Sequence, residues 1–195
     1  MNPLQDKLKN NTIILASASP RRQFLLGELN IGFQIKIPNM EEVFPENLVR
    51  EAIPLYLAEL KSDFVASELL ENEIILTADT IVWLENSVLN KPENMQDAHR
   101  MLSLLSGKKH EVITAVVLRS LHKKKVFHVV TEVYFKSLQP EEIQYYLDQY
   151  MPLDKAGAYG VQEWIGYIGV EKINGSYFNV MGLPVKELYE ELMNF

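Results

Sequence analysis

The sequence contains no cysteine, so disulfide bonds, a catalytic thiolate and a thiolate-bound zinc ion are all excluded. No apolar run approaches the ~20 residues that a membrane-spanning helix needs. Residues 1–11 are polar and lack the apolar core of a signal peptide. We therefore expect a soluble cytoplasmic protein with no membrane partner.

Three familiar catalytic motifs are also missing. The chain has no Walker P-loop, no G-x-S-x-G and no H-E-x-x-H, which removes the main sequence support for those enzyme classes. The four histidines show no metal-ligand spacing. The formal net charge of −7 argues against nonspecific binding to DNA or RNA, so we expect no nucleic-acid partner.

The composition is that of an ordinary globule. Hydrophobic residues make up 47% and charged residues 23% of the 195 residues, which excludes disorder along the whole chain. The length suits a single domain over residues 1–195, with room for two lobes. No repeat, low-complexity stretch or long linker interrupts it.

Helical and strand patterns alternate along the chain. Strand patterns occupy residues 12–16, 33–37, 74–76, 112–118, 126–135 and 167–173. Helical patterns run from Pro20 to about residue 32, from Pro54, from about Pro92 to Gly107, from Pro140, and around 185–192. In the helix from Pro54, the apolar residues Leu57, Leu60 and Phe64 lie on one face, at spacings of three and four. A polar loop is expected at 38–47, and residues 119–125 form the basic tip of a hairpin. The hairpin makes us expect a mixed α/β sheet flanked by helices rather than a purely parallel sheet.

The segment from Ser17 to Arg22 is the first candidate for chemistry. It follows a buried strand, and Ser19 and Pro20 suit the N-cap and first position of a helix. A helix N-terminus attracts anions, and the hydroxyls of Ser17 and Ser19 together with two arginines add donors suited to phosphate. The alternative is a capped helix with two solvated arginines, and the placement after a strand makes the two interpretations about equal.

Asp79 is the second candidate, because it stands at the expected carboxyl end of a buried strand, where open α/β sheets bind ligands. A carboxylate there can bind Mg²⁺ or accept a proton from water, although an aspartate that caps a turn would look the same. Three lysines, Lys61, Lys91 and Lys155, are candidates against a background in which most lysines are surface residues. Lys91 precedes an expected helix start, where a cation is disfavoured unless an anion binds.

Residues 154–162 and 175–184 are rich in small side chains and unsuited to a core. In either segment the small side chains would let the backbone approach a ligand closely. The alternative interpretation is that the segment is a flexible loop. Taken together, the residues predict an acidic α/β protein with a basic phosphate-type site and a well-placed carboxylate. Phosphate ester or anhydride chemistry follows naturally, but the residues alone leave the substrate open.

Five motifs together resemble the Maf family of nucleoside triphosphate pyrophosphatases, first named for inhibition of septum formation. They are LASASPRR at 15–22, ADT at 78–80, KP at 91–92, LSG at 105–107 and DKAGAYGVQ at 154–162. The resemblance extends from about Ile13 to Leu192. It implies an elongated mixed α/β fold with two lobes around a cleft, like that of the inosine triphosphatases. It also implies cleavage of a nucleoside triphosphate between its α and β phosphates, and it suggests a homodimer.

The same resemblance implies roles for individual residues. Asp79 matches the proton acceptor of the family. Positions linked to base selection match Arg21, Thr80 and Gln162. Polar positions around the phosphates and a divalent metal, most naturally Mg²⁺, match Ser17, Arg22, Glu42, Lys61, Lys91 and Lys155, with Glu42 and Asp79 as metal ligands. Asn90 replaces a common glycine and Ser62 a common alanine, and neither departure removes a charged residue.

The motifs also favour one branch of the family. SPRR, ADT and KAGAYG-x-Q are typical of the branch that acts on dTTP and UTP, whereas a second branch prefers 7-methyl-GTP. A house-cleaning pyrophosphatase for dTTP and UTP, including modified pyrimidine nucleotides, is therefore the leading hypothesis. A regulatory protein that arrests cell division through a partner is the alternative from another class. An inactive Asp79→Asn protein that still blocks division on overexpression would favour that alternative.

Overall fold

A computed structural model describes residues 2–195, and Met1 lies outside the described part. The chain divides into two compact units. The first contains the chain up to Asp79, Thr114–Val129 and Gly182–Phe195, and the second contains Thr80–Ile113 and Val130–Met181. Within residues 2–195, the helices are all too short or too polar to cross a membrane.

The strands form one mixed sheet, as the sequence predicts. They are β1 (Thr12–Leu15), β2 (Phe33–Ile35), β3 (Glu73–Leu84), β4 (Ser87–Leu89), β5 (Lys109–Arg119), β6 (Lys124–Phe135) and β7 (Val170–Asn174). Their order is β2-β1-β3-β5-β6-β7, and β4 pairs with β3. β1 runs parallel to β2 and β3, whereas β4 is antiparallel to β3 and β7 is antiparallel to β6.

Five helices fall on the expected parts of the chain with shifted ends. They are α2 (Pro20–Gly27), α3 (Ala52–Ala66), α4 (Met95–Leu105), α5 (Pro140–Tyr150) and α8 (Val185–Asn194). No helical pattern in the sequence indicates the short helices α1 (Pro3–Lys7), the 3₁₀ helix η1 (Ala156–Ala158), α6 (Trp164–Gly169) and α7 (Tyr177–Val180). Helix α2 ends at Gly27 rather than near residue 32, because Asn30 adopts a left-handed conformation that a helix cannot continue.

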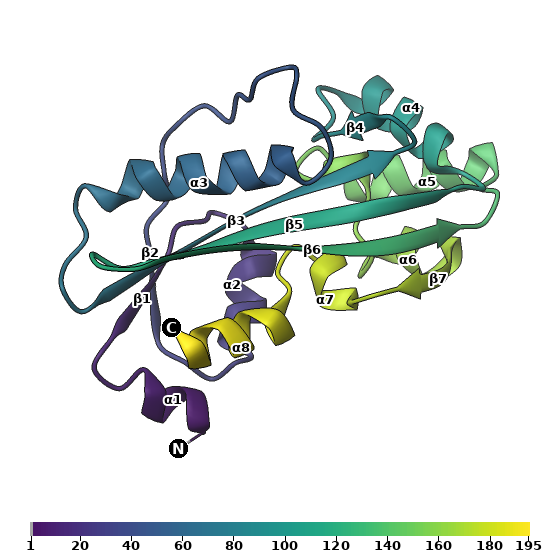
Figure 1. Ribbon diagram of the computed structural model, residues 1–195. Coiled ribbons are helices and arrows are strands. Elements are labelled where there is room, and N and C mark those ends of the chain that lie inside the picture. The colour runs from purple at the N-terminus through teal and green to yellow at the C-terminus, as the bar shows by residue number, and fades with distance from the viewer. Residues whose placement is uncertain (1) are drawn as a thin grey trace. The chain divides into compact units, whose positions relative to one another are not determined.

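In the first unit, α3 lies on one face of the strands while α2 and α8 lie on the other (Figure 1). Two small apolar clusters join α3 to the strands. Val65 packs with Ile14 and Ile75, and Ala58 packs with Ala115 and Val117. Such burial of apolar area supplies the main favourable free energy of the layer.

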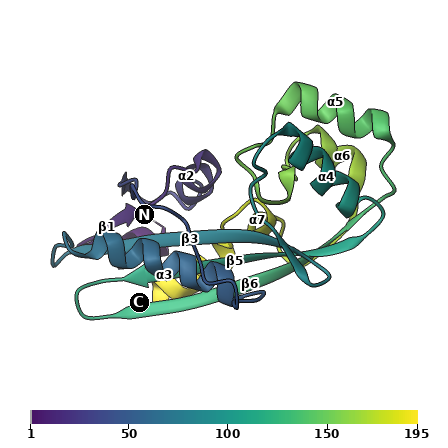
Figure 2. The ribbon, with the colours of Figure 1, turned by 90° about the horizontal axis from the view of Figure 1, so that it is seen from above.

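In the second unit, α4, α5 and α6 gather beside the parts of β3, β5 and β6 that belong to this unit (Figure 2). One large apolar cluster holds them. It includes Leu102 and Leu105 of α4, Tyr146 of α5 and Val133 of β6. Ala158 and Tyr159 belong to the same cluster, so most of the segment 154–162 is packed against the core, with Asp154 exposed at its start.

Three further expectations are wrong in detail. β3 continues through residues 77–80 instead of ending there, so Asp79 lies inside a strand. Phe64 is 53% exposed, because the buried face of α3 is rotated and carries Lys61 instead. Residues 164–169 are helical, and the last strand begins only at Val170.

Candidate active site

The connection from β1 to α2 forms a compact polar turn. The Ser19 hydroxyl accepts a hydrogen bond from the Arg22 N–H at 3.4 Å and caps α2, and the Ser17 hydroxyl accepts one from the Ser19 N–H at 3.2 Å. Arg22 donates from Nε to the Gly182 carbonyl at 2.9 Å, and its Nη1 lies 3.5 Å from the Ser17 hydroxyl. The guanidinium is thereby held beside the helix N-terminus, where an anion is favoured.

Lys61 links two carboxylates in the same unit. Its ammonium lies 2.6 Å from Asp79 Oδ1 and 3.0 Å from Glu42 Oε1. Lys61 and Asp79 are 5% and 6% exposed, so their pairing occurs out of water. Glu42, from the loop after β2, is more exposed. The predicted residues Ser17, Ser19, Arg22, Glu42, Lys61 and Asp79 therefore all lie in the first unit, and the last three form one ion-paired cluster.

Burial controls the electrostatics of this cluster. Desolvation raises the pKa of Asp79 above its usual value, although the charges of Lys61 and Arg22 act in the opposite direction. Desolvation likewise lowers the pKa of Arg22, and the adjacent Arg21 charge adds to that effect. A buried carboxylate with a raised pKa is a better proton acceptor than a solvated one.

The second unit holds Lys155 at the start of the segment 155–163. Lys155 is 8% exposed, and its ammonium lies 2.7 Å from Asp154 Oδ1 and 3.0 Å from Glu163 Oε1. Gly157 adopts a φ of 69° and packs against Val82 with no room for a side chain. These contacts hold the backbone of residues 155–163 in one conformation. The small residues of the sequence alone did not distinguish such a conformation from a flexible loop.

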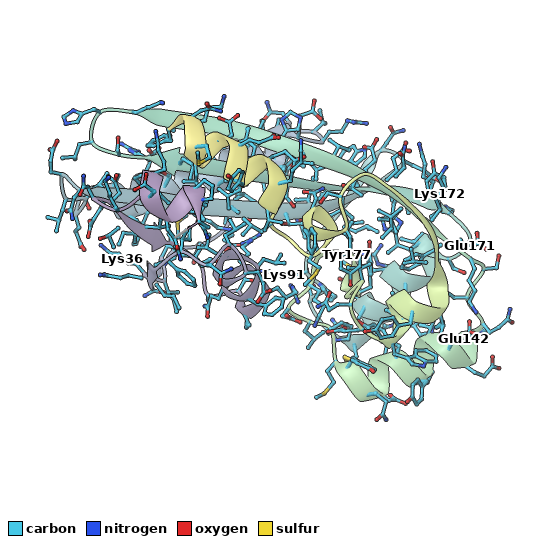
Figure 3. The ribbon with its side chains drawn as sticks, turned by 90° about the horizontal axis from the view of Figure 1, so that it is seen from below. Lys36, Lys91, Glu142, Glu171, Lys172 and Tyr177 are labelled. Carbon is cyan, nitrogen blue, oxygen red and sulfur yellow. The ribbon has the colours of Figure 1, made fainter. Side chains whose placement is uncertain are left out.

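The remaining predicted residues also have defined places. Lys91, labelled in Figure 3, lies between β4 and α4, three residues before the Asn94 N-cap. It is therefore not at the helix start, and the expected conflict with the helix dipole does not arise. The neighbouring Asn90 carbonyl accepts a hydrogen bond from the Gly157 N–H at 3.2 Å, which joins the backbone next to Lys91 to η1. Thr80 lies on β3 and Gln162 lies before α6, both partly buried, whereas Arg21 lies in the first turn of α2.

Sequence reasoning missed two buried contacts in the second unit. His110 Nε2 lies 2.7 Å from the Tyr159 hydroxyl, and burial lowers the pKa of His110 to about 3. The Tyr146 hydroxyl contacts Glu163 Oε2 and accepts a hydrogen bond from the Gly160 N–H at 3.0 Å. Tyr146 lies on α5 and Glu163 lies just before α6, and no spacing rule connects the two residues.

The oxygen donors of the first unit fit a hard divalent cation. Within residues 2–195, no three His, Cys, Asp or Glu side chains gather into a metal-binding group. Glu42 and Asp79 nevertheless contact the same ammonium. Two carboxylates so near to each other suit Mg²⁺. This ion commonly takes one or two protein carboxylates and completes its shell with water and phosphate oxygens.

The mixed sheet and the basic side chains around a buried carboxylate define an α/β protein with a site suited to anionic ligands. The chain belongs to the Maf-like protein family, which matches residues 12–195. The resemblance seen in the five motifs is thereby confirmed.

Similar proteins support this membership over nearly the whole chain. A dTTP/UTP pyrophosphatase of Phocaeicola vulgatus is 53% identical and covers 96% of this chain and 97% of its own length. A dTTP/UTP pyrophosphatase of Flavobacterium psychrophilum is 47% identical and covers 98% of each. The solved structure of the Staphylococcus aureus Ham1 protein has a TM-score of 0.51 at 14% identity, covering 94% of this chain and 99% of its own, so the two share a fold.

Proposed function

We propose that this protein hydrolyses dTTP and UTP to the nucleoside monophosphate and pyrophosphate. Relatives at about 50% identity over nearly the full chain carry the name dTTP/UTP pyrophosphatase. The observation that carries the chemistry is the buried Asp79 carboxylate held against Lys61, with Arg22 in the same unit. This arrangement suits a reaction that needs both a proton acceptor and neutralisation of phosphate charge.

The proposed reaction assigns one task to each side chain. Water adds to the α–β phosphoanhydride, a new P–O bond forms, and the bridging P–O bond breaks. Asp79 takes the proton of the attacking water and later releases it to solvent. Arg22 and Lys61 offset the charge on the phosphate oxygens, and pyrophosphate leaves.

A divalent cation completes this proposal. Glu42 and Asp79 would hold Mg²⁺, which supplies charge neutralisation on the phosphates when bound. Lys91, Lys155, Ser17 and Ser19 are proposed as polar groups toward the phosphates, and Arg21, Thr80 and Gln162 as groups that select the base. The cytoplasm, where nucleoside triphosphates are abundant, is the proposed location, and a homodimer is the proposed assembly.

A panel of nucleoside triphosphates with product analysis tests the function. We expect kcat/KM to be highest for dTTP and UTP, lower for CTP and GTP, and lower for 7-methyl-GTP. A preference for 7-methyl-GTP would place the chain in the other branch of the family. Absence of turnover with every triphosphate would refute the proposal.

A further inference from the structure

Glu163 connects two parts of the segment 155–163 through different oxygens. Oε1 lies 3.0 Å from the Lys155 ammonium, and Oε2 accepts a hydrogen bond from the Tyr146 hydroxyl. The Tyr146 hydroxyl in turn accepts the Gly160 N–H at 3.0 Å. Lys155, Glu163, Tyr146 and the Gly160 backbone therefore form one continuous chain of polar contacts inside the second unit.

The packing around this chain leaves little freedom. The Tyr146 residue is fully buried, and the Glu163 side chain is 19% exposed. A Cβ atom at position 160 would lie 2.7 Å from Glu163 Cδ, so the carboxyl group rests directly on the bare glycine. Burial and the neighbouring Glu163 raise the pKa of Tyr146, which keeps its hydroxyl protonated as a donor.

These contacts fasten the backbone on both sides of one predicted specificity residue. Gln162 lies between Gly160, held by Tyr146, and Glu163, which is held by Tyr146 and Lys155. A side chain that selects a base must be held accurately, because a displacement of about 1 Å can cost about 10²-fold in rate. The supporting contacts around such a residue decide how well it is held.

We propose that Glu163 and Tyr146 are positioning residues that fix Gln162 and Lys155 for the nucleotide substrate. This inference rests on the proposed pyrophosphatase function. The pair does not contact the reacting atoms in this account. It acts by holding the segment 155–163 in one conformation, so its loss should change discrimination between bases more than the chemistry itself.

The test compares Tyr146→Phe and Glu163→Gln with the wild-type protein, using UTP and CTP with Mg²⁺. Each variant should reduce the UTP-to-CTP ratio of kcat/KM by about tenfold, mainly through KM for UTP. Tyr145→Phe, next to Tyr146 on α5, and Glu171→Gln, on β7 and labelled in Figure 3, are controls with the same chemical changes at exposed residues. The controls should keep the wild-type ratio.

A purely structural role would give a different pattern. It would lower Tm and scale kcat for both nucleotides equally, with the UTP-to-CTP ratio unchanged, and that result overturns the inference. The double variant Tyr146→Phe/Glu163→Gln provides a second test, because the effects of substitutions at residues that act as one unit are not additive. It should be no worse than the more damaging single variant, and additive losses would contradict a shared role.

The two proposals fail in distinguishable ways. If the wild-type protein turns over no triphosphate, the pyrophosphatase function is wrong and this inference falls with it. If the wild type is active and both variants keep its base discrimination, only the positioning role is wrong. Should one variant fail to fold, the other still decides the question through the same ratio.

Discussion

Two opposing influences act on the carboxyl group of Asp79. Burial disfavours its charge, whereas the Lys61 ammonium at 2.6 Å and the Arg22 guanidinium favour it. The balance raises the pKa of Asp79, which makes its carboxylate more basic without removing the partners that keep it ionised. In the proposed reaction this balance sets the pH at which the proton acceptor becomes available.

The balance can be tested by removing the cation. In Lys61→Gln the pKa of Asp79 should rise further, because the largest influence that lowers it is lost. The acidic limb of the kcat/KM profile reports the free enzyme's essential base, so it should move to higher pH. Lys36→Gln, which removes a lysine paired with Glu68 elsewhere in the same unit, is the control and should leave the limb in place. If the acidic limb of the kcat/KM profile does not move in Lys61→Gln, the titration of Asp79 is not the cause of that limb.

The adjacent arginines should differ in their effects. They point about 100° apart around the axis of α2, given ~3.6 residues per turn, and Arg22 is the one fastened to Gly182 and Ser17. Arg22→Ala should lower kcat/KM for dTTP, UTP, CTP and GTP by a similar factor. Arg21→Ala should change the ratio between them, with losses of about 1.5–3 kcal/mol for each charge-assisted hydrogen bond. Equal scaling of all four nucleotides by Arg21→Ala would remove its proposed role in specificity.

At this scale the sequence predicts local contacts better than distant ones. Ser19 as an N-cap followed from its place before Pro20, and the structure confirms it. The pairing of Glu163 with Tyr146 joins residues 17 positions apart on different elements, and only packing brings them together. No periodicity or motif carries that information.

At the scale of elements, β3 shows why polar residues misled the assignment of strand ends. Thr77 and Asp79 suggested a strand end, yet both are accommodated inside a buried strand by α3. The Thr77 hydroxyl donates to the Ala58 carbonyl at 2.7 Å, and Asp79 pairs with Lys61. Because α3 offers each of these buried side chains a polar partner, the strand continues past them. The same contacts explain why the buried face of α3 includes Lys61 rather than Phe64.

The aromatic cluster between β5, β6 and η1 makes a separate prediction. His110 packs edge-on against Phe135 and Tyr159, and burial lowers its pKa from 6.5 to about 3. Because the folded pKa is depressed, the neutral ring's contribution to stability is present above about pH 6.5. It is lost progressively as the pH falls toward 3.

The free energy of unfolding of the wild type and His110→Phe, measured between pH 7 and pH 4, tests this effect. The wild type's advantage over the variant should shrink by a few kcal/mol as the pH falls, since each unit of pKa difference corresponds to about 1.4 kcal/mol. A gap between the two proteins that does not change with pH would mean that His110 titrates normally in the folded state.

At the scale of the whole molecule, the fold class was predictable, whereas the positions at which the chain passes from one compact unit to the other were not. Alternating helical and strand patterns with one long hairpin led to a mixed sheet, and the structure has that sheet. Three long strands, β3, β5 and β6, each contribute residues to both compact units. A boundary that falls inside continuous strands leaves no linker, turn or change in composition for sequence reasoning to detect.

Substrate binding should stabilise the protein as a whole. A dTTP analogue with an uncleavable α,β-imido bridge, at about 100 times its Kd, should add about 2.7 kcal/mol. For a chain of this size that corresponds to an increase in Tm of about 5–10 °C, measurable by differential scanning fluorimetry in the presence of Mg²⁺. The matching CTP analogue at the same concentration should give a smaller shift, and equal shifts would argue against selection of thymine and uracil over cytosine.

Product analysis of dTTP hydrolysis by the wild type beside Asp79→Asn tests the central claim most directly. The substitution is nearly isosteric, so the protein should stay folded by circular dichroism while losing about 10²–10⁴-fold in rate with its general base. The account predicts that the wild type yields dTMP and pyrophosphate in equal amounts with no dTDP, and that the folded variant yields almost none. Formation of dTDP with orthophosphate, or near wild-type turnover by Asp79→Asn, would contradict it.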